Sequence, residues 1–261
     1  MTMRQLEGRT VLIVGAGRDP GRGIAHRFAR EGARLLLIDR DRDAGEALLA
    51  EFGDQAHLAV ADPCEQLALT AAIASLQAQV THVDILVNAA LEEPAWTRLE
   101  ALDDAHFAHA FAQGFSAALW AMRALLPSMR ANGGGRILNV GSVYGENVAE
   151  YIGGYAAASE ALRSLTRTAA QEWGVDGIRV NLLMPTVDSE RFRAYSEANR
   201  EVVGRSLPLV ALQRFGDPVE DIGGAALYLV SDDSCYITGY TIHADGGYHL
   251  AGPVYVPTLS D

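Results

Sequence analysis

The chain has 261 residues, with 21 Lys and Arg against 33 Asp and Glu, and its formal net charge is therefore -12. Hydrophobic residues make up 49% and charged residues 21%, which is typical of a globular chain and excludes a disordered or collagen-like one. The acidic excess argues against a surface for nucleic acid or for an anionic membrane, because both need a basic footprint.

The start of the chain leads into a strand without an apolar signal region, and no uncharged stretch is apolar enough to span a membrane. The two cysteines, Cys64 and Cys235, lie far apart and have no neighbouring Cys or His ligands. We therefore expect a cytoplasmic protein without a disulfide scaffold and without a metal site.

Short apolar runs alternate along the chain with segments that are long enough for helices. The runs predict buried strands at residues 11–14, 35–38, 57–60, 85–87, 137–140, 180–183 and 240–243. The segments between them predict helices at residues 21–31, 43–52, 63–80, 103–129, 155–173 and 218–230. This alternation predicts an α/β fold, a Rossmann-like, doubly wound sheet of about seven parallel strands flanked by helices. No repeat or linker interrupts it, so we expect residues 1–261 to form a single dinucleotide-binding domain.

A glycine-rich turn follows the first predicted strand. It contains Gly15, Gly17 and Gly21, with Arg18 and Asp19 between them. Glycines at this place let the backbone turn tightly and approach a pyrophosphate at the start of the next helix. Taken alone, the turn is equally typical of an ordinary strand–helix connection.

Polar side chains stand at the ends of the next three predicted strands. Asp39 ends the second strand, where a carboxylate accepts hydrogen bonds from ribose hydroxyls and repels a 2′-phosphate, which favours NAD over NADP. The adjacent Arg40 weakens that argument, because an arginine accommodates a 2′-phosphate. Asp62 is placed to accept from an adenine amino group, and Asn88 follows the fourth strand in the same crevice. Each acid by itself is also explained as a helix cap, whereas the three together predict a cofactor site.

From about residue 6 to residue 250 the sequence resembles the short-chain dehydrogenase/reductase family. The resemblance lies in residues 15–33, 86–90, 135–142, 177–181, 214–222 and 237–247, and in Tyr155 with its helix. It implies hydride transfer between an alcohol and a carbonyl with a nicotinamide cofactor. It further implies that Ser142 binds the substrate oxygen and that Tyr155 is the acid/base. Tyr155, Ser159, Pro185 and Val187 then join the cofactor contacts.

Five positions depart from the family pattern, and three of them bear on the proton relay and the phosphates. Ser159 stands at the position of the family's lysine, Gly114 at that of its asparagine, and Asp19 at that of its middle glycine. A lysine lowers the tyrosine pKa from its usual value of about 10, and an uncharged serine does not. We therefore expect a weakened proton relay that harms alcohol oxidation more than carbonyl reduction. Asp19 is expected to cap the following helix and to point away from the phosphates.

The sequence predicts an NAD(H)-preferring oxidoreductase that acts on a small alicyclic or aromatic substrate, because aromatic side chains such as Trp96, Tyr144 and Tyr151 occupy the loops beyond the strands. Two alternatives stay open. One is a non-redox lyase, isomerase or dehalogenase that uses the same serine and tyrosine, and the other is a catalytically inactive protein on this fold. The helices expected at 103–129 and 155–173 are apolar on more than one face, and the resemblance implies a homotetramer or homodimer through them.

Overall fold

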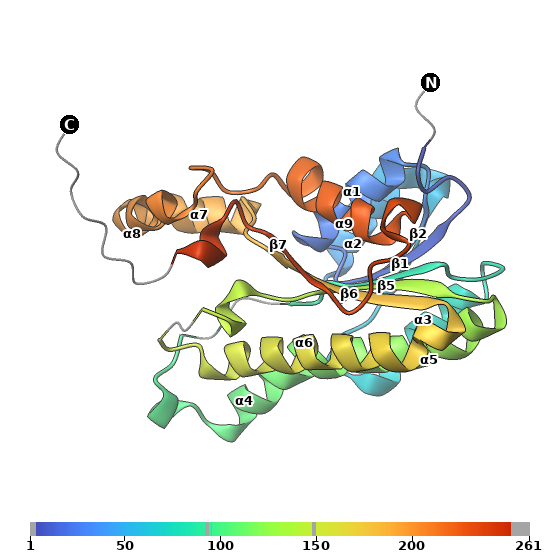
Figure 1. The fold of residues 1–261 in the computed structure, drawn as a ribbon, viewed down its shortest axis with the longest axis horizontal. Helices are drawn as coiled ribbons and strands as arrows, with labels where there is room; N and C mark the ends of the chain where they lie inside the picture. The colour runs from blue at the N-terminus through green and yellow to red at the C-terminus, as the bar shows by residue number, and fades with distance from the viewer. Residues whose placement is uncertain (1–3, 92–93, 95, 148–149, 252–261) are drawn as a thin grey trace.

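The computed structural model describes residues 4–91, 94, 96–147 and 150–251 (Figure 1). Its centre is a parallel sheet of seven strands in the order β3-β2-β1-β4-β5-β6-β7. The strand order reverses between β1 and β4. In open α/β sheets, ligands bind beyond the carboxyl ends of the strands at such a reversal.

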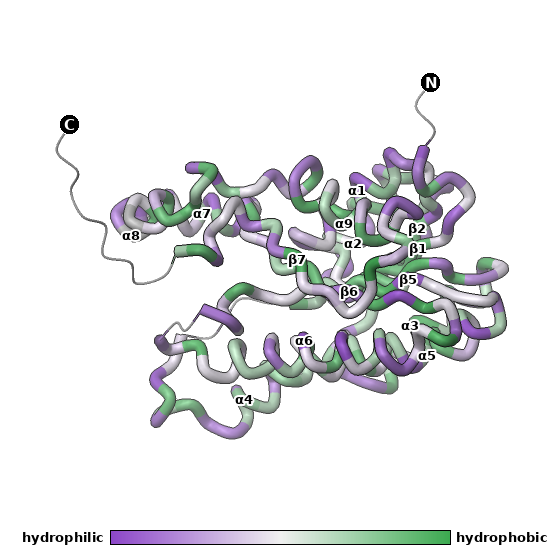
Figure 2. Tube along the Cα trace, viewed as in Figure 1, coloured by the Kyte–Doolittle hydropathy of each residue, from purple (hydrophilic) through white to green (hydrophobic). Residues whose placement is uncertain are grey.

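All seven predicted strands are confirmed. They are β1 (Thr10–Val14), β2 (Arg34–Asp39), β3 (Ala56–Val60), β4 (Ile85–Asn88), β5 (Gly135–Val140), β6 (Ile178–Pro185) and β7 (Thr241–Ala244). Hydrophobic residues are concentrated in this sheet (Figure 2). Alternate side chains of β1 enter two separate apolar clusters, Val11 and Ile13 in one and Leu12 and Val14 in the other. The sheet is therefore buried on both faces, as its continuous apolar runs predict.

Helices cover both faces of the sheet (Figure 1). On one face lie α1 (Gly21–Arg30), α2 (Arg42–Phe52) and α9 (Gly223–Val230), and on the other lie α3 (Gln66–Gln77), α5 (Ala117–Ala131) and α6 (Gly153–Trp173). Phe28 of α1 and Leu125 of α5 are fully buried examples from the two clusters. This three-layer arrangement confirms the predicted fold class.

Two of the predicted helices are interrupted. The helix expected at 103–129 consists of α4 (Asp104–Phe111), a π-helical turn η3 (Ala112–Ser116) that contains Gly114, and α5. The helix expected at 218–230 begins with a second π-helical turn, η7 (Pro218–Ile222), before α9. A π turn inserts one extra residue into the helical ladder, and periodicity in the sequence does not reveal it.

Two further helices, α7 (Glu190–Ala198) and α8 (Arg200–Ser206), occupy a segment without a predicted element. Ser189 caps α7, because its Oγ accepts a hydrogen bond of 3.0 Å from the backbone N–H of Phe192. The pair follows β6 and stands beyond the carboxyl edge of the sheet (Figure 1). Among the described residues, no helix is long and apolar enough to cross a membrane, and no group of His, Cys, Asp and Glu is arranged to hold a metal ion.

Candidate cofactor and active site

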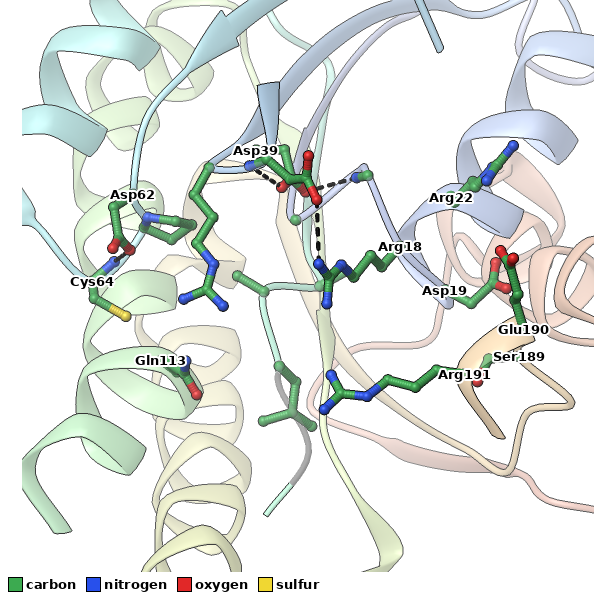
Figure 3. A pocket seen from close by; sticks show the side chains of 18 of the residues that line it. Arg18, Asp19, Arg22, Asp39, Asp62, Cys64, Gln113, Ser189, Glu190 and Arg191 are labelled. Carbon is green, nitrogen blue, oxygen red and sulfur yellow. Dashed lines mark hydrogen bonds and ion pairs between the residues drawn. The ribbon is translucent and has the colours of Figure 1, made fainter. Parts of the chain in front are cut away.

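A cavity of about 440 Å³ opens at the carboxyl ends of β1 to β4, where the strand order reverses. Its walls come from the glycine-rich turn, the ends of β2 and β3, the segment after β4 and the start of α7 (Figure 3). The predicted residues that line it are Gly15, Arg18, Asp19, Asp39 and Asp62. Residues from separate segments of the sequence are therefore brought to one site.

Three glycines shape the turn at the base of this cavity. Gly15 has a φ of +83°, and a Cβ there would lie 2.6 Å from the Cα of Ala90. A Cβ on Gly21 would lie 2.0 Å from the carbonyl oxygen of Gly15, so Gly21 serves the close packing of α1 against the turn. It is not among the described residues that line the cavity. Gly17 leaves room for the Asp39 carboxyl group, whose carbon would lie 2.9 Å from a Cβ at that position.

The carboxylate of Asp39 is held rigidly in the cavity wall. Asp39 is the last residue of β2, and its Oδ2 accepts a hydrogen bond of 2.7 Å from the backbone N–H of Gly17. Its Oδ1 accepts one of 2.9 Å from the backbone N–H of Asp41. Two backbone donors therefore fix the orientation of the carboxylate, which fits a group that must receive ribose hydroxyls in one geometry.

Asp62 lies at the other end of the cavity, beyond β3 (Figure 3). Its Oδ1 accepts a hydrogen bond of 2.9 Å from the backbone N–H of Cys64, which also lines the cavity. Burial, together with the adjacent Asp62 carboxylate, raises the pKa of the Cys64 thiol to about 12. No motif in the sequence around Cys64 indicates that it belongs to the site.

Asn88 is the last residue of β4, whereas the sequence predicts that it follows this strand. It therefore lies deeper in the sheet than expected. Its Nδ2 donates a hydrogen bond of 2.8 Å to Asn139 Oδ1, and Asn139 Nδ2 donates one of 2.9 Å to Thr166 Oγ1. This buried chain of polar groups links β4, β5 and α6. The Asn88 Oδ1 is buried and has no hydrogen-bond partner among the described residues. A small hollow beside it is lined by Asn88 and Gly114.

Asp19 binds the first turn of α1, as expected, but it does not point away from the cavity. Its Oδ1 accepts a hydrogen bond of 3.2 Å from the backbone N–H of Gly23, although Asp19 still lines the cavity. Burial raises the pKa of Asp19, and this effect is opposed by the Gly23 hydrogen bond and by the positive charges of Arg22 and Arg193.

The predicted catalytic residues stand beyond the carboxyl end of β5. Ser142 follows that strand, and its Oγ accepts a hydrogen bond of 3.3 Å from the backbone N–H of Tyr144 in the short helix η4 (Val143–Gly145). This turn packs against α6, where Tyr155 lies in the first turn of the helix. A Cβ on Gly145 would lie 3.2 Å from the Cβ of Ser159. Serine, tyrosine and the Ser159 position are thus gathered at one corner of the sheet.

The remaining predicted residues are placed as follows. Ser159 is completely buried, and its Oγ has no hydrogen-bond partner in the described part of the chain. Pro185 ends β6, and Val187 forms a parallel bridge with Gly216. None of these three, nor Ser142 or Tyr155, is among the described residues that line the 440 Å³ cavity.

Comparisons with known proteins agree with this arrangement. A family model described as Enoyl-(Acyl carrier protein) reductase matches residues 15–249. Galactitol 2-dehydrogenase (L-tagatose-forming) of Cereibacter sphaeroides is 37% identical over 250 residues, covering 95% of this chain and 97% of the relative. Sorbitol dehydrogenase of the same organism is 33% identical, with 93% and 98% covered. The chain belongs to the short-chain dehydrogenase/reductase family.

Solved structures support the same assignment for this short-chain dehydrogenase/reductase. The structure of 3-ketoacyl-(acyl-carrier-protein) reductase from Brucella melitensis complexed with NADH matches with a TM-score of 0.85 at 28% identity, covering 93% of this chain and 99% of that chain. Levodione reductase matches with a TM-score of 0.88 at 27% identity, covering 95% and 100%. With named dehydrogenases and reductases matched over most of its length, the protein is an oxidoreductase of this family.

The structure also brings residues to the cavity that no sequence motif marks individually as site residues. They are Arg22, Asp41, Cys64, Gln113, Glu190 and Arg191. For Glu190 and Arg191, the sequence gives one indication of a helix: Ser189 is followed by an acidic residue, which is typical of a helix start. The segment lacks the apolar periodicity that would strengthen it.

Proposed function

We propose that the protein is an NAD(H)-preferring oxidoreductase that interconverts an alcohol and a carbonyl on a small alicyclic or aromatic substrate. The observation that carries the cofactor assignment is the Asp39 carboxylate, which two backbone N–H groups hold at the end of β2. A carboxylate in that position receives the ribose hydroxyls of NAD and repels the 2′-phosphate of NADP. The nicotinamide, when bound, supplies or accepts the hydride.

The arginine of the glycine-rich turn does not remove this preference. Arg18 Nη2 lies 3.2 Å from Asp41 Oδ2, so its charge is already matched by a carboxylate within the protein. The Asp39 carboxylate accepts from two backbone amides, which orient it and leave its negative charge in place. Asp39 therefore keeps a negative charge at the end of β2, where a 2′-phosphate would have to lie, and Arg40 lines the same cavity as the competing positive charge.

In this proposal Ser142 and Tyr155 act on the substrate oxygen. During reduction the Tyr155 hydroxyl donates its proton to the carbonyl oxygen, while Ser142 donates a hydrogen bond to the same atom. Ser159 stands in the place of the family's lysine and brings no charge that would lower the tyrosine pKa. A tyrosine is protonated at neutral pH, since its usual pKa is about 10. We therefore expect the missing lysine to harm carbonyl reduction less than alcohol oxidation.

Aromatic side chains near Ser142 support a ring-bearing substrate. Burial raises the pKa of Tyr144, and the neighbouring hydroxyls of Tyr248 and Tyr195 add to the effect. These three phenols come from η4, from the short helix η9 (Tyr248–Leu250) and from α7. The two sugar-alcohol dehydrogenases among the relatives make an open-chain polyol the natural competing substrate class.

Quaternary structure and location are part of the same proposal. We propose a single cytoplasmic domain that pairs through the helices at 103–129 and 155–173 into a homodimer or homotetramer. Phe107 of α4 is 43% exposed and contacts Phe111, with ring centroids 4.9 Å apart. Pairing between copies would cover this aromatic surface.

The decisive experiment is a set of redox assays with NAD(H) on cyclic ketones and alcohols, aryl ketones, galactitol and sorbitol, comparing the wild type with Tyr155→Phe. We expect turnover of at least one ring-bearing ketone by the wild type and a loss of about 10²–10⁴-fold in the variant. Turnover of the polyols alone would overturn the substrate class. Activity retained in the variant would overturn the role of Tyr155.

A further inference from the structure

The helix α7 carries an arginine into the cofactor cavity from outside the glycine-rich turn. Arg191 lies in the first turn of α7 and lines the cavity together with Arg18 of the turn after β1. Figure 3 shows the two side chains extending into the same space from different elements. Arg22 and Arg40 also line the cavity, so its wall is rich in guanidinium groups.

Three acids of the cavity wall have partners within the protein. Asp39 accepts from two backbone N–H groups, and Asp41 is paired with Arg18. Asp19 accepts from the backbone N–H of Gly23 and faces the positive charges of Arg22 and Arg193. These contacts hold the three carboxylates in place, and Glu190, next to Arg191, is a further acid of the wall.

Resting on the proposed cofactor, we propose that Arg191 binds the diphosphate of the dinucleotide. The start of α1 attracts the diphosphate through its backbone N–H groups, whereas the Asp19 carboxylate beside it opposes a negative ligand. An arginine supplies a planar pair of donors that matches phosphate oxygens and restores the favourable charge. This makes Arg191 a cofactor-binding residue that the glycine-rich motif does not contain.

The test is a set of binding titrations with NADH, ADP and adenosine on the full chain. The variants are Arg191→Gln, Arg191→Lys and the control Arg200→Gln, whose residue begins α8 and does not line the cavity. We expect Arg191→Gln to weaken NADH and ADP by about 10-fold or more and to leave adenosine, which has no phosphate, unchanged. Arg191→Lys should recover part of the loss, and Arg200→Gln should match the wild type. Raising the salt concentration should narrow the difference between the wild type and Arg191→Gln.

Two outcomes overturn the inference while leaving the proposed function standing. One is wild-type NADH affinity in Arg191→Gln, and the other is an equal loss for adenosine, which would indicate a distorted pocket. Thermal melting of each variant identifies a folding defect. If Arg191→Gln has such a defect, the NADH and ADP affinities of Arg191→Lys test the proposal instead. A lysine at this position that recovers no phosphate-dependent affinity contradicts it. A wild-type protein that binds no NADH contradicts both proposals together.

Discussion

Glu146 Oε2 lies 2.7 Å from His243 Nε2, and this contact joins the turn after Ser142 to the edge strand β7. The other carboxylate oxygen of Glu146 lies 3.4 Å from an Arg163 nitrogen on α6. The His243 ring stacks on that of His249, with centroids 4.2 Å apart. One carboxylate therefore connects the turn after Ser142 to a strand and to the helix that carries Tyr155.

Removing this carboxylate should slow the reaction by displacing Ser142. We expect Glu146→Ala to lower kcat about 10-fold with a smaller change in cofactor affinity, because small displacements of a positioned group cost much of its effect. Glu146→Gln, which keeps one hydrogen-bonding oxygen, should lose less. Steady-state kinetics against the exposed control Glu172→Ala measures the effect. Equal kcat in Glu146→Ala and the control would show that the network does not position the serine.

Asp39 should decide the cofactor preference. We expect Asp39→Ala to weaken NADH binding about 10–100-fold and to raise the affinity for NADPH, because the variant loses charged acceptors and the repulsion of a 2′-phosphate. Fluorescence titration with both cofactors gives the ratio directly. If the ratio of the two affinities does not change, the carboxylate does not discriminate between them.

Ser159 should tolerate the loss of its hydroxyl group. The Oγ is fully buried without a hydrogen-bond partner among the described residues, and such a group costs free energy on folding. We expect Ser159→Ala to raise the free energy of unfolding by about 1 kcal/mol in urea denaturation. NADH affinity should fall a few-fold if the hydroxyl contacts the ribose. Destabilisation would mean that the hydroxyl has a partner in the folded protein.

Cys64 should be the slower of the two thiols in alkylation. Its pKa is raised to about 12, so almost no thiolate forms at neutral pH, whereas Cys235 is exposed. Mass spectrometry after timed iodoacetamide treatment separates the two sites. The pKa of Cys64 in the folded protein exceeds the reference value of 9.0, so folding favours the protonated thiol. The stability that this thiol contributes is therefore fully present below pH 9.0 and is lost as the pH rises from 9.0 towards 12. Faster labelling at Cys64 would contradict the burial of its thiol.

The strands and the polar residues at their carboxyl ends are predictable from the sequence for a clear reason. Buried parallel strands are continuous apolar runs, and the residue at the end of each run falls at the same edge of the sheet, so the pattern alone places Asp39 and Asp62 there. The helix α7 is not predictable in this way, since its residues are mostly polar and only the Ser189 cap marks its start. A π turn such as η3 leaves no trace in an apolar pattern.

Contacts between distant segments are the least predictable part. Glu146 and His243 are 97 positions apart in the chain, and nothing in either neighbourhood indicates that they meet. The same holds for Asp19 and Arg193, which only the folded chain brings near each other. In contrast, the capping role of Asp19 is local and is predictable from its position before α1.

The most direct test of the central claim is calorimetric titration of the wild-type protein with NADH and with NADPH. The arrangement of Asp39 predicts saturable NADH binding well below about 1 mM, and NADPH binding weaker by about 10-fold or more. Tighter binding of NADPH would contradict the cofactor preference. Absence of binding by both cofactors would contradict the oxidoreductase mechanism itself.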